Sequence, residues 1–207
     1  MEISFENIHI TKPITNVDIY VLGLSIKNIY YSTLVGMKSF SHFTSFNEDD
    51  LKIDMRELLS NTKINKVNLN TWNDIGIKNI SSMASMFLNS TAEEITFGKL
   101  DTSKVTNMSR MLDLCKNLKH VDISSLDTSK VEEMYELFRD CTSLDFDEIT
   151  LDVSSAINLF DMFTGSCIRK AYLKNPSDII VKMYNRFDKK EFEYYFNSNN
   201  TTEIELI

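Results

Sequence analysis

Hydrophobic residues in the middle of the chain recur at a spacing of 25 or 26 residues. Three apolar rows share this spacing, and each row has one member in each of four successive copies. The rows are Met83, Met108, Met134 and Leu159; Met86, Met111, Leu137 and Met162; and Phe87, Leu112, Phe138 and Phe163. The segment Leu-Asp-Thr-Ser-Lys-Val occurs at residues 100–105 and again at 126–131. These matches indicate an internal repeat, with a degraded earlier copy at residues 55–72.

Within one copy the hydrophobic period changes from helical to extended. Val105, Met108 and Met111 follow the spacing of one face of a short helix. The Asp-Thr-Ser sequence before them offers oxygen atoms to the unpaired N–H groups of a first helical turn. From residue 120 onward polar and apolar residues alternate, as in a strand with one buried face. The pattern therefore predicts an α/β solenoid of about five helix–strand units, whose stacked units cover one another.

The two ends of the chain differ from the repeat. Residues 1–49 contain short alternating stretches, which predict a β-rich N-terminal cap before a solenoid at residues 50–174. Residues 175–207 are expected to form a helical C-terminal cap and tail, because apolar residues at 179–187 have helical spacing after a possible N-cap at Ser177. For residues 197–207 two alternatives stay open: a frayed end or a final strand.

The repeat around Leu100–Phe163 resembles the BspA-like leucine-rich repeats of bacterial surface proteins. The string Leu-Asp-Thr-Ser-Lys-Val-Thr-Asn-Met-Ser-Arg-Met-Leu-Asp-Leu-Cys, which begins at Leu100, is similar to that family's repeating unit. The resemblance is strong over Leu100–Phe163 and looser over Met55–Lys174. It implies a leucine-rich-repeat-type solenoid with a strand-lined face, and a role in adhesion or protein recognition.

Charge and composition narrow the classes of partner. Hydrophobic residues make up 43% of the chain, which is enough to bury a continuous core. The 22 basic and 30 acidic residues give a net charge of -8, and no basic run is present, so direct nucleic-acid binding is not expected. A protein with a basic surface is a compatible partner. Self-association into a homo-oligomer is left open.

The beginning of the chain has neither the basic start nor the apolar run of a signal peptide. The sequence also has no apolar stretch of 18 residues, so no membrane association is expected. We therefore expect a cytoplasmic protein, and a surface location only if a leader was removed.

Three repeated side-chain types allow a functional and a structural interpretation. Cysteines at 115, 141 and 167 suggest a metal or redox row, but zinc needs a fourth ligand, and burial as small hydrophobic residues is favoured. Asp101, Asp127 and Asp152 suggest a calcium column, but capping by these residues explains them better. Methionine rows suggest an adaptable groove, but core filling is favoured. No metal or cofactor is expected.

Catalysis is not expected either. His9, His42 and His120 fall in different elements, and no catalytic motif or phosphate-binding glycine loop is present. Enzymatic activity would require an unexpected catalytic site in the non-repeat ends of the chain.

The outward side chains of the strands form the predicted partner-binding site, because stacked units present them as one surface. Tyr172 is the expected hot spot, since exposed aromatic residues supply large contact areas. The full set is Lys66, Asn68, Asn70, Glu94, Thr96, His120, Asp122, Ser124, Glu148, Thr150, Lys170, Tyr172 and Lys174.

The sequence predicts a non-catalytic protein–protein recognition module that binds through this face and the caps. One alternative is a small acidic inhibitor of a nucleic-acid-processing enzyme, of a phage or viral counter-defence type, that blocks a basic surface. A second alternative is an adhesin fragment. Salt separates the first two, because charge-driven binding weakens steeply as ionic strength rises.

Overall fold

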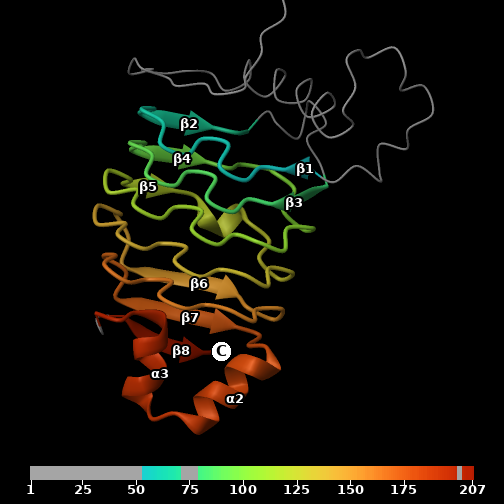
Figure 1. Ribbon diagram of the computed structural model, residues 1–207, viewed down its shortest axis with the longest axis vertical. Coiled ribbons are helices and arrows are strands. Elements are labelled where there is room, and N and C mark those ends of the chain that lie inside the picture. The colour runs from blue at the N-terminus through green and yellow to red at the C-terminus, as the bar shows by residue number, and fades with distance from the viewer. Residues whose placement is uncertain (1–52, 71–78, 200–201) are drawn as a thin grey trace, which may run out of the picture.

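The structure is a computed structural model that describes residues 53–70, 79–199 and 202–207. Figure 1 shows successive copies of the repeat stacked along the long axis, and we call each copy a layer. The elements are β1 (Ile53–Asp54), β2 (Lys66–Asn68), β3 (Ile80–Ser82), β4 (Glu94–Thr96), β5 (His120–Val121), the 3-10 helix η3 (Ile123–Ser125), β6 (Glu148–Asp152), β7 (Lys170–Lys174), α2 (Asp178–Arg186), α3 (Lys189–Phe196) and β8 (Glu203–Leu206).

All strand pairs in the described residues are parallel, and each joins two layers. The groups are β1–β3, β2–β4–β5 and β6–β7–β8. The β1–β3 edge continues through single bridges from Ser82 to Asn107, Glu133 and Asn158. Positions that are equivalent in the sequence repeat therefore lie beside one another in the stack.

The predicted fold class, a solenoid of about five helix–strand units, is wrong. The segments expected to be helical are runs of turns, and the α-helices of the described chain are α2 and α3, both near the C-terminus. The structure has two three-stranded parallel sheets and a two-stranded one in place of regular units.

Hydrogen bonding explains why these segments are not helices. The N–H groups of Arg110 and Leu112 donate to the carbonyls of Tyr135 and Leu137 in the next layer, at 2.9 and 3.1 Å. The N–H group of Met111, between them, donates back to the Met108 carbonyl at 3.2 Å. An α-helix needs every interior N–H for its own carbonyls four residues back. In this segment every second N–H group donates to a carbonyl of the next layer, so it is not available for a helix.

A pair of left-handed residues shapes each run of turns. In five successive layers two residues four positions apart have φ between 53° and 73°. They are Glu57 and Asn61, Ser85 and Asn89, Arg110 and Leu114, Glu136 and Asp140, and Asp161 and Gly165. Each non-glycine residue in this conformation costs roughly 1–2 kcal/mol. The hydrogen bonds between layers offset that cost, and the turns still return every third or fourth side chain to the interior.

The three apolar rows form the core, as the sequence predicted. All twelve residues are at most 1% exposed. Phe138 and Phe163, in consecutive layers, stack with ring centroids 6.0 Å apart. Burial of one such side chain contributes roughly 1.5–3 kcal/mol. The interpretation of the methionine rows as core filling is therefore confirmed.

The C-terminal segment continues the stack. Ser177 is the N-cap of α2, as predicted, and its hydroxyl accepts a hydrogen bond from the Ile180 N–H at 3.4 Å. Strand β8 pairs with β7, so the described end of the tail is a strand and not frayed. The expected N-terminal cap at residues 1–49 lies outside the described residues. Among the described helices, none is long and apolar enough to cross a membrane.

Candidate functional site

The strand face brings most of the predicted site residues into two groups. Lys66, Glu94 and His120 align across β2, β4 and β5, and Asn68 lies opposite Thr96. In the second sheet the aligned pairs are Glu148 with Lys170, Thr150 with Tyr172, and Asp152 with Lys174.

Three predicted residues have other positions. The Asp122 carboxylate accepts hydrogen bonds from the N–H groups of Phe97 and Gly98 at 2.6 and 3.0 Å, so it holds the preceding layer in place. Asn70 packs directly over Gly98, where a Cβ atom would lie 1.8 Å from its Oδ1. Ser124 lies in η3 and is exposed, but it is not on a strand.

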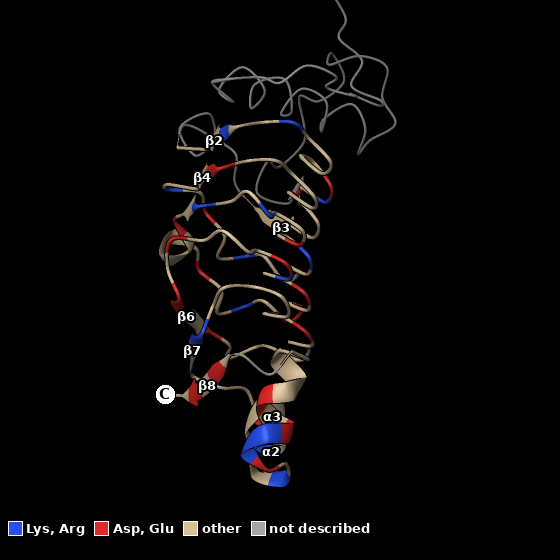
Figure 2. Cartoon of the chain, turned by 90° about the vertical axis from the view of Figure 1, so that its left-hand side faces the viewer, with Lys and Arg blue, Asp and Glu red and all other residues tan. Residues whose placement is uncertain are grey.

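Charges on the strand side pair between layers. Lys66 and Glu94 form an ion pair at 2.6 Å, and the His120 Nδ1 atom is hydrogen-bonded to the Asp145 carboxylate. The other pairs are Lys119–Glu93 at 2.8 Å, Arg169–Asp147 at 2.8 Å and Lys170–Glu205 at 3.2 Å. Figure 2 shows the resulting alternation of basic and acidic segments down this side. Each exposed pair contributes at most about 1 kcal/mol to stability, but together they prevent a continuous acidic patch.

Tyr172 is less available than the sequence suggested. It is half-buried, and the Lys170 ammonium lies 4.9 Å from the centroid of its ring. The Tyr172 side chain and then the Glu205 carboxylate raise the pKa of Lys170 to about 12. A partner would have to displace this lysine to reach the ring.

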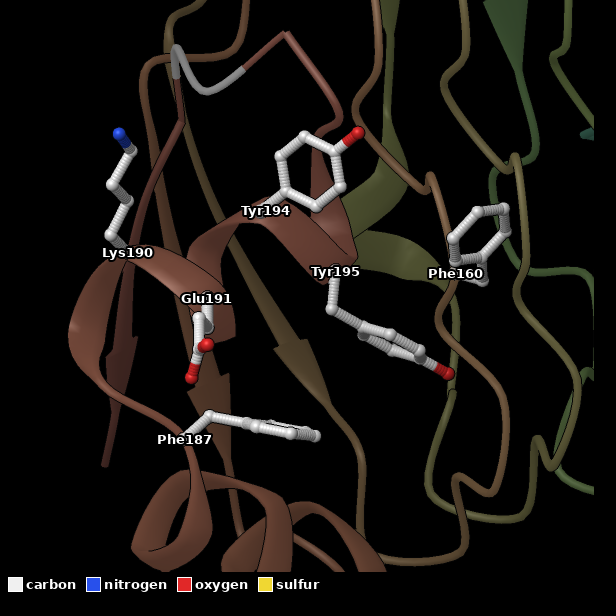
Figure 3. A pocket seen from close by; sticks show the side chains of 6 residues that line it. All are labelled: Phe160, Phe187, Lys190, Glu191, Tyr194 and Tyr195. Carbon is white, nitrogen blue, oxygen red and sulfur yellow. The ribbon is translucent and has the colours of Figure 1, made fainter.

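A second candidate surface lies at the helical end, and sequence reasoning missed it. Phe160, Phe187 and Tyr194 are 44%, 38% and 54% exposed, although large aromatic residues are usually buried. Together with Tyr195, Lys190 and Glu191 they line an open pocket of about 370 Å³. Figure 3 shows the rings around this pocket and the Lys190 ammonium turned away from them. We call the six residues the aromatic surface.

The rings of the aromatic surface come from three separate segments of the chain. Phe187 is the C-cap of α2, and α3 begins two residues later. A capping box fixes that start: the Asp188 carboxylate accepts the Glu191 N–H at 2.8 Å, and the Glu191 carboxylate accepts the Asp188 N–H at 3.3 Å. This short connection turns the chain sharply and brings Phe187 near the tyrosines of α3.

Phe160 and Tyr195 connect the last layer to α3. Their ring centroids are 5.7 Å apart in an edge-to-face arrangement. The Tyr195 hydroxyl accepts a hydrogen bond from the Leu159 N–H at 3.3 Å and lies 3.4 Å from Asn158 Oδ1. Burial raises the pKa of Tyr195 above its usual value. Tyr195 therefore forms a fixed wall, while Tyr194 offers exposed ring surface. Phe187 is also partly exposed, and the Arg186 guanidinium lies 5.9 Å from the centroid of its ring.

Comparison with known proteins places most of the stack in one family. Residues 53–175 match the family described as Mycoplasma protein of unknown function, DUF285. The chain belongs to the DUF285 family. This family is related to the BspA-like surface proteins, while the leucine-rich-repeat class implied by the resemblance stays a prediction. No curated protein and no solved structure matches the chain.

The DUF285 match covers the strand face but only part of the aromatic surface. It begins at β1 and ends just after β7, so it includes Phe160. Phe187, Tyr194 and Tyr195 lie beyond it, on or beside α2 and α3. The aromatic surface is thus completed by a segment outside the match.

The cysteines of the DUF285 segment have structural roles. Cys115 and Cys141 are fully buried, and their thiols donate to carbonyls one layer back at 3.0 and 3.1 Å. Burial raises the pKa of Cys115 to about 12. Cys167 departs from the predicted row: Ser166 takes the equivalent backbone position, and Cys167 is half-buried. Counting a constant 26 residues missed the 25-residue step between these layers.

The aspartate row also has a structural role, though not at helices. The Asp101 carboxylate accepts hydrogen bonds from the Ser103 N–H and hydroxyl at 3.0 and 2.6 Å. These bonds lower the pKa of Asp101. Asp127 repeats this pattern with Ser129, so these residues cap turns instead of helices. The described residues contain no cluster of three or more His, Cys, Asp or Glu side chains suited to a metal ion.

Proposed function

We propose that this DUF285 protein is a non-catalytic recognition module that binds a partner protein through the aromatic surface. The observation that carries this proposal is the open pocket of about 370 Å³ bordered by three partly exposed rings. Tyrosine and phenylalanine side chains give large contact areas with little loss of side-chain entropy, and they are enriched in protein interfaces. The outward position of Phe187 and Tyr194 fits such a contact.

The character of the pocket favours a protein side chain as its occupant. The walls present ring faces, while the charged groups of Lys190 and Glu191 belong to its lining at the rim. An apolar side chain loses little by entering such a site, because it leaves no polar group without a hydrogen bond. A polar rim around an apolar centre is the usual arrangement of a protein interface.

The strand face is the weaker surface for the proposed recognition. Its charges are paired between layers, and Tyr172 lies beneath Lys170. The ion pairs between layers also give the acidic-inhibitor alternative no support on the strand side. A basic partner would meet alternating charges there instead of an acidic surface.

Capture with the full chain tests the proposal. Immobilised wild-type protein and a Phe187→Ala/Tyr194→Ala variant are incubated with lysate at low and high salt, and retained proteins are identified by mass spectrometry. A Glu148→Ala/Thr150→Ala variant on the exposed strand face is the matched control. We expect the control to retain the wild-type partner at both salt concentrations, because apolar contacts are not screened. A partner that the aromatic variant retains equally well, and the control does not, would refute the proposal.

A further inference from the structure

Two rings of the aromatic surface border its pocket from two sides. Figure 3 shows the Phe187 ring below the open space and the Tyr195 ring above it. The face of an aromatic ring carries partial negative charge, so it attracts a cation within about 6 Å of the ring centroid. The Arg186 guanidinium already lies 5.9 Å from the centroid of Phe187. Arg186 does not line the pocket, so the pocket remains open to a second cation.

The charged side chains beside the pocket also favour a positively charged occupant. In Figure 3 the Lys190 ammonium points away from the rings, whereas the Glu191 carboxylate lies beside the open space. The neighbouring Lys189 pairs with Glu193 and Glu203, at 3.7 and 3.3 Å. Within the described part of the chain, Glu191 forms no ion pair. Its charge is therefore available to an incoming cation.

Glu191 can bind such a cation without leaving the capping box of α3. Its Oε2 atom accepts the Asp188 N–H at 3.3 Å, which uses one of the two carboxylate oxygens. An ionised carboxylate has about four acceptor sites, so Oε1 can accept further hydrogen bonds. The capping box holds the carboxylate in place at the pocket, which lowers the entropy cost of binding.

The exposed ring area suits one side chain and not a whole interface. Phe160, Phe187 and Tyr194 together leave roughly 270 Å² exposed, if a whole aromatic residue presents about 200 Å². A stable interface usually needs about 800 Å² from each partner. Arginine is one of the residues that most often fill a single pocket in an interface. Its planar guanidinium stacks on rings, and its N–H groups bind a carboxylate in pairs, whereas a lysine ammonium does neither.

From these observations we infer that the pocket receives an arginine side chain of the partner protein. The apolar stem of this arginine packs against Phe187 and Tyr195, and its guanidinium binds the Glu191 carboxylate. This inference rests on the proposed recognition function and names the group of the partner that enters the same site. One partly enclosed ion pair beside apolar contacts is screened little, so binding depends only weakly on salt.

Titration of the full chain with small probes tests this inference. N-acetyl-arginine methylamide, the corresponding lysine and leucine compounds, and tetramethylammonium chloride are added separately. The backbone amide signals of α3 are followed by NMR. We expect the arginine compound to bind about 10-fold more tightly than the leucine compound, because only the arginine gains the ring faces and the carboxylate together.

Two substitutions separate the charge from the ring. Glu191→Gln removes the charge but keeps the capping box, because glutamine also accepts the N-cap N–H. We expect it to weaken binding of the arginine compound by about 10-fold and to leave the leucine compound unaffected. Phe187→Leu keeps an apolar wall without a ring face and should weaken the arginine compound by about 5-fold. Glu148→Gln on the exposed strand face is the matched control and should change nothing.

The other outcomes overturn the inference. They are absence of arginine binding, equal binding of the arginine and leucine compounds, and arginine binding that Glu191→Gln does not weaken. Tighter binding of tetramethylammonium than of the arginine compound also overturns it, in favour of a free quaternary ammonium ligand. A partner protein that is lost by the Phe187→Ala/Tyr194→Ala variant but fully retained by Glu191→Gln overturns the inference and leaves the proposed function standing.

Discussion

The backbone carbonyl of Tyr195 accepts a hydrogen bond from the Asp161 N–H at 2.9 Å. In earlier layers the equivalent acceptor is a carbonyl of the next run of turns, such as Phe160 for Glu136. The last turn of α3 therefore takes the place of a further layer. It satisfies N–H groups that would otherwise face the open end of the stack.

The Tyr195 hydroxyl strengthens this junction, which gives a first prediction. In a Tyr195→Phe variant the Leu159 N–H loses its acceptor at 3.3 Å. We expect the free energy of unfolding to fall by about 1 kcal/mol, since a partly buried donor is left unsatisfied. Urea denaturation measures the change. Tyr194→Phe is the control and should have no effect on stability, because Tyr194 is 54% exposed.

A buried carboxylate between two layers gives a second prediction. Asp113 is fully buried and accepts two hydrogen bonds from Arg139, both at 2.9 Å, and one from Arg110 at 2.9 Å. An Asp113→Asn variant keeps the volume but loses the charge-assisted bonds. We expect it to lose about 2–3 kcal/mol of unfolding free energy.

The control for Asp113 is an ion pair on the surface. Lys119→Gln removes the exposed pair with Glu93 and should change the unfolding free energy by less than about 1 kcal/mol. Equal effects of the two substitutions in urea denaturation would show that the buried network adds nothing to the connection between layers.

The core could be predicted from the sequence, but the local backbone could not. A spacing of three and four residues returns side chains to one side in a helix and also in a run of turns with two left-handed residues. Met108 and Met111 are therefore buried in either case. The sequence signal that distinguishes a run of turns from a helix is the residue type at the left-handed positions. Asn61, Asn89 and Gly165 are types that tolerate positive φ. Leu114 at the same position obscures that signal.

The aromatic surface was hidden for a different reason. Phe187 fits the helical spacing of the C-terminal segment, which predicts that it lies within a helix. Instead, α2 ends at Arg186, and Phe187 lies at the turn into α3. Phe160 directly follows the buried row residue Leu159 and is 44% exposed. Its proximity to Tyr195 depends on contacts between distant segments, and the repeat spacing contains no information about them.

Differences in thiol burial give a third prediction. Cys115 and Cys141 are fully buried, whereas Cys167 is half-buried. A thiol reagent needs access and the thiolate form. Ellman's reagent at pH 8 should therefore label Cys167 first in the native protein, and the other two only after unfolding in urea. Cys167→Ser should abolish the native labelling. Three thiols that react at one rate would contradict the buried positions of Cys115 and Cys141.

The same burial makes stability depend on pH in the alkaline range. Burial raises the pKa of Cys115 from 9.0 to about 12, and it raises the pKa of Cys141 well above 9.0. Above pH 9 the unfolded chain releases these protons while the folded chain keeps them. Stability is therefore complete below pH 9 and falls as the pH rises toward 12, by about 1.4 kcal/mol per pH unit for each thiol.

Substitution by serine isolates the part that Cys115 contributes to this slope. Serine suits this position because Ser90 occupies the equivalent place in an earlier layer and is buried at 3% exposed. Urea midpoints are compared at pH 8 and pH 10 for the wild type, Cys115→Ser and Cys167→Ser. We expect Cys115→Ser to lose about 1.4 kcal/mol less than the wild type over this interval, because a serine hydroxyl does not ionise there. Cys167→Ser should follow the wild type. If Cys115→Ser kept the full wild-type slope, the Cys115 thiol would already ionise in the folded protein near pH 9, which its complete burial beneath the Phe87 carbonyl opposes.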